Sequence, residues 1–504
     1  METSQAYQDL LSRMKELTLL NTTAGVLSWD QEVLMPPANA PHRGGQMALL
    51  AGMIHERFTS PKMGELLDQA SSQEKTQAPL SDAAVNLREW KRSYERARRL
   101  PQSLVEELAR VSSQAQVEWV EARREKSFSR FEPWLARLVE LVQQQSRCYG
   151  YEKHPYDALL EDYEPGLTTQ VLDDLFPPLA ENLTRLLFSV ANSPVKPDRS
   201  LLHRTCPVAL QEAFCRDLAS SIGFDFSRGR LDVSAHPFTT GLGPSDTRIT
   251  TRFDPNDFCN SFFSALHEAG HGLYDQALPA PHFGTPCGEA VSLGIHESQS
   301  RLWENLVGRS LPFWVHFFPL MRQKFPGVFD DVTLEDFHLA INQAAPSLIR
   351  TEADEISYNL HIILRYELEK DLLTGSLLAK DVPEAWNHSM EKKLGLVPGD
   401  DALGCLQDVH WSHGSFGYFP TYTLGNLFAA QFMEAARRDL PSLEDLFSRG
   451  DFTPLRNWLR EKIHLQGQRF RSEDLCLHVT GKPLSSKAFT QYLSSKYGAL
   501  YQIR

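Results

Sequence analysis

The chain lacks most of what marks a secreted or membrane protein. Its seven cysteines among 504 residues are scattered and form no CxxC pair, which argues against a disulfide framework or a sulfur metal site. No apolar run is long enough to cross a bilayer, and the start, Met1 to Gln5, lacks the basic and apolar segments of a secretory signal. We therefore expect a cytoplasmic protein with reduced thiols and no membrane partner.

Positive charge is also scarce, since 51 basic residues face 64 acidic ones and give a net charge of −13. Proteins that bind nucleic acid concentrate positive charge on one surface. The basic stretch from Lys91 to Arg99 is interrupted by Glu95, which is typical of a solvated helix face. The composition therefore predicts no nucleic-acid partner.

Most of the sequence has the spacing of amphipathic helices, as in its first segment, where the apolar positions are Tyr7, Leu10, Leu11, Met14 and Leu17. The exception is the region 229–253. There the alternating segments 231–234 and 248–253 flank Gly241-Leu242-Gly243-Pro244 and predict a small antiparallel sheet, one edge of which can pair with an extended peptide. We expect a mainly α fold, one catalytic domain over 1–504. Its N-terminal helical lobe (about 1–200) and its metal-site and substrate-binding lobe (about 201–504) are expected to flank a deep central cleft.

The most informative motif is His267-Glu268-Ala269-Gly270-His271. Its spacing places both imidazoles on one helix face, where a single metal ion can bridge them. The glutamate between them can then activate water, as in zinc-dependent peptidases. The alternative is a chance histidine pair on an ordinary helix.

A catalytic zinc site usually has a third protein ligand. The metzincin pattern is excluded, because the position of its third histidine holds Ala277 and that of its glycine holds Tyr274. A glutamate from a later helix is the other common solution. Spacing alone leaves Glu297, Glu304 and Glu289 as candidates.

In these and further motifs the chain resembles the carboxypeptidase Taq family of metallocarboxypeptidases. The matching segments lie in the family's order, cover nearly the whole chain and show no departure at a motif position; they are Leu27–Pro36, Gly223–Asp232, His236-Pro237-Phe238, Asp246–Thr250, the His267 motif, His296–Ser300, Ile349–Asp354 and Gly404–Trp411. The resemblance implies broad side-chain specificity, short peptide substrates and a homodimer.

By position, the resemblance also implies that His267, His271 and Glu297 bind one divalent metal ion and that Glu268 is the general acid and base. Zinc is the expected ion, and cobalt or manganese suits the same ligands. Glu304, two turns after Glu297, is then expected to be a supporting or surface group.

A carboxypeptidase must recognise a free terminal carboxylate, which a guanidinium matches best. The candidates are Arg248, expected at the sheet edge, and Arg350, expected on a helix facing the cleft. The alternative for each is a pair within the protein, with Asp246 for Arg248 and with Asp354 for Arg350.

Attack of water on a peptide carbonyl creates an oxyanion that needs aimed donors. The segment 410–422 offers imidazoles and phenols and is similar to the His/Tyr element of the zinc peptidases that include angiotensin-converting enzyme. We expect Tyr422 to be the oxyanion donor, with His410 and Tyr418 holding the substrate; the alternative is that they are core aromatics with satisfied polar tips. His236 is expected to contact substrate or to brace the sheet.

The predicted function is a metal-dependent carboxypeptidase that releases single C-terminal residues from peptides. Two alternatives stay open, an oligopeptidase that cuts internally and a catalytically silent scaffold stabilised by metal. His361 is set apart as structural, because its helical neighbour four residues on is Arg365 rather than a ligand.

Overall fold

The computed structural model describes residues 4–74 and 78–503. The prediction about a signal segment rests partly on residues 1–3, which lie outside the described residues. The chain forms two compact units of three segments each. Unit 1 comprises Met1–Arg98, Asp198–Ile341 and Phe432–Lys482, and unit 2 comprises Arg99–Pro197, Asn342–Gln431 and Pro483–Arg504.

The two units interleave along the chain, whereas the predicted lobes, about 1–200 and 201–504, were contiguous. Helical periodicity identifies helices but does not show which distant helices pack together. The spacing of apolar residues therefore could not predict that the two units alternate along the chain. The single catalytic domain and its deep cleft stay predictions.

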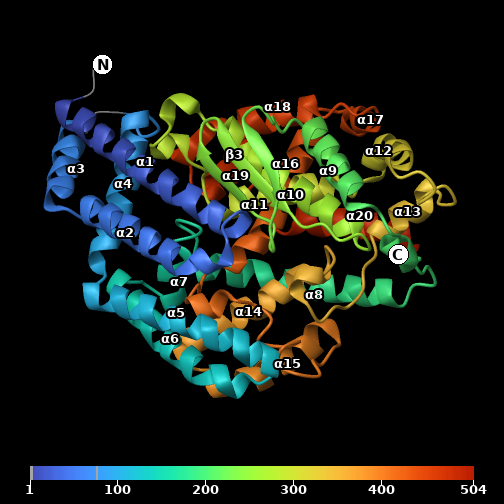
Figure 1. The fold of residues 1–504 in the computed structure, drawn as a ribbon, viewed down its shortest axis with the longest axis horizontal. Coiled ribbons are helices and arrows are strands. Elements are labelled where there is room, and N and C mark those ends of the chain that lie inside the picture. The colour runs from blue at the N-terminus through green and yellow to red at the C-terminus, as the bar shows by residue number, and fades with distance from the viewer. Residues whose placement is uncertain (1–3, 75–77, 504) are drawn as a thin grey trace. The chain divides into compact units, whose positions relative to one another are not determined.

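Unit 1 combines helices with the small sheet (Figure 1). Its helices are α1 (Gln5–Val33), α2 (Ala40–Phe58), α3 (Pro61–Gln73), α4 (Asp82–Arg99, reaching one residue past the unit), α9 (Val208–Ile222), α10 (Phe258–Ala277), α11 (Leu293–Arg301), α12 (Leu311–Lys324), α13 (Leu334–Ile341), α17 (Leu443–Ser448), α18 (Thr453–Lys462) and α19 (Ser472–Thr480). Its strands are β1 (Gly229–Val233), β2 (Thr239–Gly243) and β3 (Asp246–Thr251).

Unit 2 is helical in the part of the chain that the structure describes. Its helices are α5 (Gln102–Glu125), α6 (Phe128–Tyr149), α7 (Pro155–Leu160), α8 (Thr169–Ala191), α14 (Ser357–Thr374), α15 (Val382–Leu394) and α20 (Lys487–Tyr501). Helix α16 (Pro420–Asp439) contains the boundary between the units. The prediction of a mainly α fold with a small sheet is confirmed.

The apolar spacing predicted for the first helix is also seen in the packing of unit 1. Tyr7, Leu10 and Leu17 of α1 are buried in one cluster with residues of α3 and α4, and Leu11 and Met14 pack against it. Burial of such a face is the main source of stability for a surface helix.

The sheet differs from the predicted small antiparallel sheet in the direction of one strand pair. Its order is β1-β3-β2, and β1 pairs with β3 in parallel, while β2 pairs with β3 antiparallel. The segment 241–244, expected to be only a connection, contributes to β2, which extends from Thr239 to Gly243. Because this extra strand reverses the chain between β1 and β3, those two strands run in the same direction.

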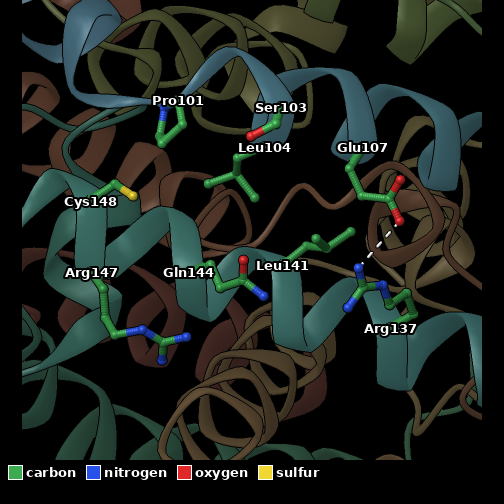
Figure 2. Close-up of a pocket in the computed structure, with 9 residues that line it drawn as sticks. All are labelled: Pro101, Ser103, Leu104, Glu107, Arg137, Leu141, Gln144, Arg147 and Cys148. Carbon is green, nitrogen blue, oxygen red and sulfur yellow. Dashed lines mark hydrogen bonds and ion pairs between the residues drawn. The ribbon is translucent and has the colours of Figure 1, made fainter.

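Unit 2 has a surface hollow of about 470 Å³ between α5 and α6 (Figure 2). Two of its lining residues, Glu107 and Arg137, form an ion pair 3.2 Å apart. None of its lining residues belongs to the predicted site.

Five of the seven cysteines are buried, and all seven are free thiols. Among the described residues, no helix combines the length and the apolar character needed to span a bilayer.

Candidate metal centre and active site

Helix α10 carries the His267 motif and begins at a side-chain cap. The carboxylate of Asp257 accepts a hydrogen bond from the backbone N–H of Asn260, 3.2 Å away, which satisfies a donor that the helix itself leaves free. The helix lies beside β3 of the sheet (Figure 1). His267 and His271 occur one turn apart on it, as the motif spacing predicts.

The glycine of the motif brings a second helix close. A Cβ on Gly270 would lie 2.7 Å from the carbonyl oxygen of Gln299 and 2.7 Å from Cα of Ser300, which is too close for any side chain. These residues belong to α11, which begins at Leu293. The hydroxyl of Ser292, its N-cap, accepts a hydrogen bond from the N–H of Ile295 at 3.1 Å. The bare glycine therefore allows α11 to lie directly against α10.

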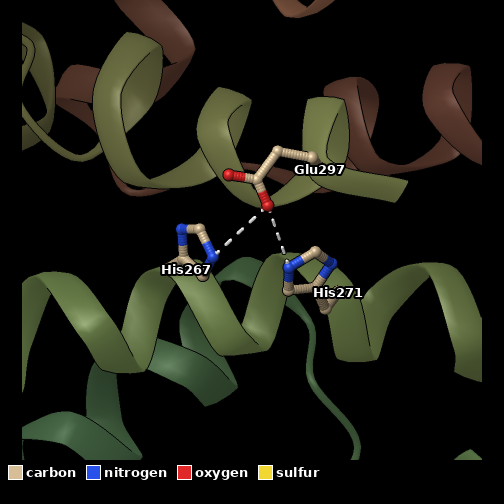
Figure 3. Close-up of side chains that lie close together, drawn as sticks. All are labelled: His267, His271 and Glu297. Atoms are coloured by element: carbon tan, nitrogen blue, oxygen red, sulfur yellow. Dashed lines mark ion pairs between the residues drawn. The ribbon is translucent and has the colours of Figure 1, made fainter. Parts of the chain in front are cut away.

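This close packing places the carboxylate of Glu297 over both imidazoles (Figure 3). Its Oε2 lies 3.7 Å from Nε2 of His267 and 3.4 Å from Nε2 of His271. One donor atom from each of the three side chains lies within 4.8 Å of the others. Two imidazole nitrogens and one carboxylate oxygen that converge in this way fit a divalent metal site of the zinc-peptidase type.

Glu289, the other glutamate that spacing had left open, is outside this cluster of described residues. Glu304 lies in the π-helix Leu302–Val307 that follows α11. Its Oε2 accepts a hydrogen bond from Nδ1 of His267 at 2.8 Å. Glu304 is thus a supporting group, which turns the other ring nitrogen of His267 toward Glu297.

Arg301 ties the two carboxylates together. Its Nε donates to Oε1 of Glu297 at 2.7 Å, and its Nη1 donates to Oε2 of Glu304 at 3.2 Å. Burial alone would raise the pKa of both carboxyl groups, but Arg301 and the nearby histidines outweigh it. The pKa of Glu297 is held well below its usual value and that of Glu304 falls to about 2, so both groups are ionised at neutral pH.

Glu268 is buried and accepts a hydrogen bond from the hydroxyl of Thr239, on β2, at 2.6 Å. The same hydroxyl lies 3.0 Å from the backbone carbonyl of Glu268. Burial raises the pKa of Glu268, against the opposing effects of His267 and Thr239. A raised carboxyl pKa suits a group that must accept and return a proton near neutral pH.

Nδ1 of His271, the ring nitrogen that faces away from Glu297, contacts another imidazole, whereas Nδ1 of His267 contacts a carboxylate. Nδ1 of His271 lies 2.5 Å from Nδ1 of His296, whose Nε2 lies 3.1 Å from Oδ1 of Asp275. Burial lowers the pKa of His271 to about 4, so its ring is neutral at pH 7, as a metal ligand must be.

Arg248 lies on β3, the central strand, and the expectation that it lies at a sheet edge is wrong, because β2 covers the side that would have been free. Its guanidinium is bidentate to Asp246, with distances of 2.9 and 2.8 Å. It also stacks 4.2 Å over the ring of Trp29. The pair with Asp246, stated as the alternative, is present in the structure.

Arg350 lies in a short 3₁₀ helix, Arg350–Glu352, just before α14. Its partner is Asp408, 2.7 Å from Nη2, and not Asp354. Asp354 instead accepts a hydrogen bond from the N–H of Ser357, the first residue of α14, at 3.0 Å. The spacing argument for Asp354 fails because the chain between the two residues is not one α-helix.

The carboxylate of Asp408, whose side chain is 10% exposed, also binds Arg365, 2.5 Å away. His361, set apart as structural, is fully buried, and its Nε2 lies 3.0 Å from the carbonyl of Ser347. Burial, with Arg365 nearby, lowers the pKa of His361 to about 3. The structural role expected for His361 agrees with these contacts.

The segment 410–422 brings three predicted residues together in unit 2. Nε2 of His410 lies 3.4 Å from the hydroxyl of Tyr422, and the ring of Tyr418 lies 5.3 Å from each of the other two rings. Nδ1 of His410 is buried and has no hydrogen-bond partner among the described residues. Burial lowers the pKa of His410 to about 4.

Glu369 of α14 holds this segment in place. Its buried carboxylate accepts from Nε1 of Trp411 at 2.9 Å, from the N–H of Gly417 at 3.1 Å and from the hydroxyl of Tyr156 at 2.7 Å. His236, by contrast, is exposed, and its carbonyl accepts from the hydroxyl of Ser234 at 2.6 Å.

Sequence reasoning missed several of these supporting residues. Arg301 could have been found, because it follows Glu297 by four residues on one helix. Thr239, His296 and Glu369 could not, since each meets its partner only through the tertiary fold.

Known proteins are similar to this one over nearly its whole length. The family description "Carboxypeptidase Taq (M32) metallopeptidase" matches residues 9–497. Thermostable carboxypeptidase 1 of Thermus thermophilus is 48% identical over 505 residues, covering 98% of this chain and 99% of the relative. Carboxypeptidase 1 of Bacillus subtilis is 38% identical over 501 residues, covering 99% and 100%.

The fold is similar as well. The crystal structure of an M32 carboxypeptidase from Deinococcus radiodurans R1 superposes with a TM-score of 0.96 at 39% identity and covers 99% of this chain and 100% of that one. The family predicted from the motifs is thereby confirmed. The chain belongs to the carboxypeptidase Taq (M32) family of metallopeptidases and is a metallocarboxypeptidase.

Proposed function

We propose that the protein releases single residues of broad side-chain type from the C-terminus of short peptides, at a metal centre formed by His267, His271 and Glu297. The observation that carries the proposal is the convergence of two Nε2 atoms on Oε2 of Glu297, with Glu268 between the two histidines in sequence. These three residues would hold a divalent ion, which would supply polarisation of the scissile carbonyl and a lowered pKa of bound water. Zinc is our proposal for this ion, on the strength of the two imidazoles and one carboxylate.

Glu268 is proposed to take the proton from the attacking water and to deliver it to the leaving amine. Its two carboxylate oxygens differ, because Thr239 donates to Oε2 at 2.6 Å. No hydrogen bond from the described residues engages Oε1 in the same way, so Oε1 is the oxygen we assign to proton transfer.

The remaining roles are proposed for side chains of unit 2. Tyr422 is the proposed oxyanion donor, with His410 and Tyr418 as substrate contacts. We propose Arg350, in preference to Arg248, as the residue that binds the terminal carboxylate of the substrate. Its guanidinium lies 5.2 Å from the ring of Tyr422 and thus near the proposed oxyanion donor.

The test is a digestion time course on an unmodified peptide and on its C-terminally amidated form, read by mass. We expect stepwise loss from the C-terminus of the free peptide, abolished by a chelator and restored by metal. Equal cleavage of the amidated form would instead favour an internally cutting oligopeptidase. Absence of any cleavage by the metal-loaded protein would favour the silent scaffold.

The two arginines are separated in the same assay. We compare Arg350→Lys with Arg248→Lys. The variant that removes the carboxylate anchor is expected to raise KM for the free peptide and to reduce the difference in cleavage rate between the free and the amidated peptide. The homodimer and the cytoplasmic location, both drawn from the resemblance and the composition, are proposals that light scattering and cell fractionation test.

A further inference from the structure

The two histidines of the proposed metal centre are supported in different ways at their outer nitrogens. Nδ1 of His267 meets the carboxylate of Glu304 at 2.8 Å. A carboxylate only accepts hydrogen bonds, so Nδ1 of His267 must carry the proton, and Nε2 is left with the lone pair. One contact therefore fixes the tautomer of His267.

His271 has no such contact, because its Nδ1 meets another imidazole, that of His296, at 2.5 Å. A neutral imidazole has one donor and one acceptor nitrogen. Seen alone, the pair allows the proton to lie on either side. If His296 donated, the remaining proton of a neutral His271 would lie on Nε2, where it blocks metal binding.

The contact one step further out removes this ambiguity. Nε2 of His296 lies 3.1 Å from Oδ1 of Asp275, and a carboxylate there requires the N–H on Nε2 of His296. In a neutral His296, Nδ1 is then the acceptor, and Nδ1 of His271 must donate to it. The lone pair of His271 thereby falls on Nε2, the atom that faces Glu297 at 3.4 Å.

We propose that Asp275 and His296 act as a two-step relay that fixes the tautomer of His271 and so prepares it to bind the metal. Asp275 lies one turn after His271 on α10, and His296 directly precedes Glu297 on α11. The relay therefore also links the two helices that carry the ligands. Asp275 and His296 are positioning residues, since neither points a donor atom into the cluster formed by the three ligands.

The sheet leaves room for the relay. A Cβ on Gly241 of β2 would lie 2.9 Å from Oδ2 of Asp275, so the glycine lets that carboxylate lie against the strand. The ring of His296 packs 5.0 Å from that of Tyr274. Both relay side chains are mostly shielded, with 20% and 16% of their surface exposed for His296 and Asp275, which limits competition from water.

The inference rests on the proposed metal centre, and its test measures zinc affinity of the metal-free protein by competition with a chromophoric chelator, without substrate. Asp275→Asn keeps the size of the side chain but lets its amide donate to Nε2 of His296, which reverses the relay. We expect affinity to fall about 10–100-fold, the usual cost of losing such a support. Asp275→Glu, which can only accept, is expected to bind zinc within about threefold of the wild type.

A double-mutant comparison identifies the route. In His296→Asn the amide oxygen replaces Nδ1 as an acceptor for His271 without needing Asp275. Adding Asp275→Asn to this variant is then expected to change zinc affinity by less than about twofold.

The outcomes are distinct. If Asp275→Asn binds zinc as tightly as the wild type, the relay is overturned. It is also overturned if Asp275→Asn lowers zinc affinity equally in the wild type and in His296→Asn, since Asp275 would then act without His296. A wild-type protein that binds no zinc would instead overturn the proposed metal centre. Circular dichroism of each metal-free variant separates loss of affinity from loss of fold.

Discussion

The proposed metal centre of unit 1 and the His410–Tyr422 segment of unit 2 differ in how neighbouring side chains hold them. Around the metal centre, charged partners engage the ligands closely, with Arg301 on Glu297 at 2.7 Å and Glu304 on His267 at 2.8 Å. In unit 2, His410 and Tyr422 are 3.4 Å apart, and Nδ1 of His410 has no partner among the described residues. The proposed metal ligands thus have close charged partners, whereas the contact between His410 and Tyr422 is long, as is common for catalytic groups before substrate binds.

The sharpest test of the metal centre is Glu268→Gln. The amide cannot accept and return a proton, so we expect kcat to fall by about 1000-fold or more. Zinc content is expected to stay the same, because Glu268 is not among the three converging side chains. Activity near the wild-type level would remove Glu268 from the mechanism.

The matching test of unit 2 is Tyr422→Phe. Loss of one oxyanion donor is expected to lower kcat about 100-fold with little change in KM. Tyr418→Phe is the control, since Tyr418 is proposed to hold substrate and its loss should act mainly on KM. If both variants behave alike, the two tyrosines do not have separate roles.

Gly270→Ala tests whether close helix packing prepares the metal centre. The added methyl group would meet backbone atoms of α11 at 2.7 Å, so we expect the free energy of unfolding to fall by about 1–3 kcal/mol and zinc affinity to fall with it. Gly52→Ala in α2 is the control, because a Cβ there meets nothing within 4 Å; its unfolding free energy should be unchanged or higher. Denaturant unfolding measures both.

Thr239→Val removes the hydroxyl beside Glu268 and keeps the shape of the side chain. We expect kcat to fall about tenfold, the equivalent of one hydrogen bond of about 1.4 kcal/mol, with KM unchanged. Thr239→Ser restores the hydroxyl and should recover most of the rate. A serine variant as slow as the valine variant would show that the methyl group matters instead.

The smallest effect is on the pH dependence of stability through His361 in unit 2. Its pKa is about 3 in the fold and about 6.5 when unfolded, so the unfolded chain binds the proton first as pH falls. The free energy that His361 contributes to stability is therefore fully present above pH 6.5. It is lost as the pH falls toward 3, at up to about 1.4 kcal/mol per pH unit. In His361→Gln the slope between pH 5.5 and 4.5 should be smaller by about that amount, measured by denaturant unfolding.

The sequence predicted the geometry of the proposed metal centre better than that of the other proposed site residues. The spacing on α10 predicts two neighbouring imidazoles, and the family resemblance, rather than spacing, singled out Glu297, whose carboxylate lies beside both. The substrate side chains depend on distant partners: Arg350 pairs with Asp408, 58 residues away, and spacing had suggested Asp354. The mixed sheet was missed because a glycine-rich strand, β2, lacks the β-branched alternation that predicts strands.

The hydroxyl of Thr239 has two oxygen neighbours and one hydrogen, with Oε2 of Glu268 at 2.6 Å and the carbonyl of Glu268 at 3.0 Å. While Glu268 is ionised, the hydroxyl donates its hydrogen to Oε2 of the carboxylate. Once Glu268 has taken up a proton on Oε1, its Oε2 can still accept the hydrogen bond from the hydroxyl, because a protonated carboxyl group keeps acceptor capacity. A single small side chain can thus stay bonded to the base through both halves of each turnover.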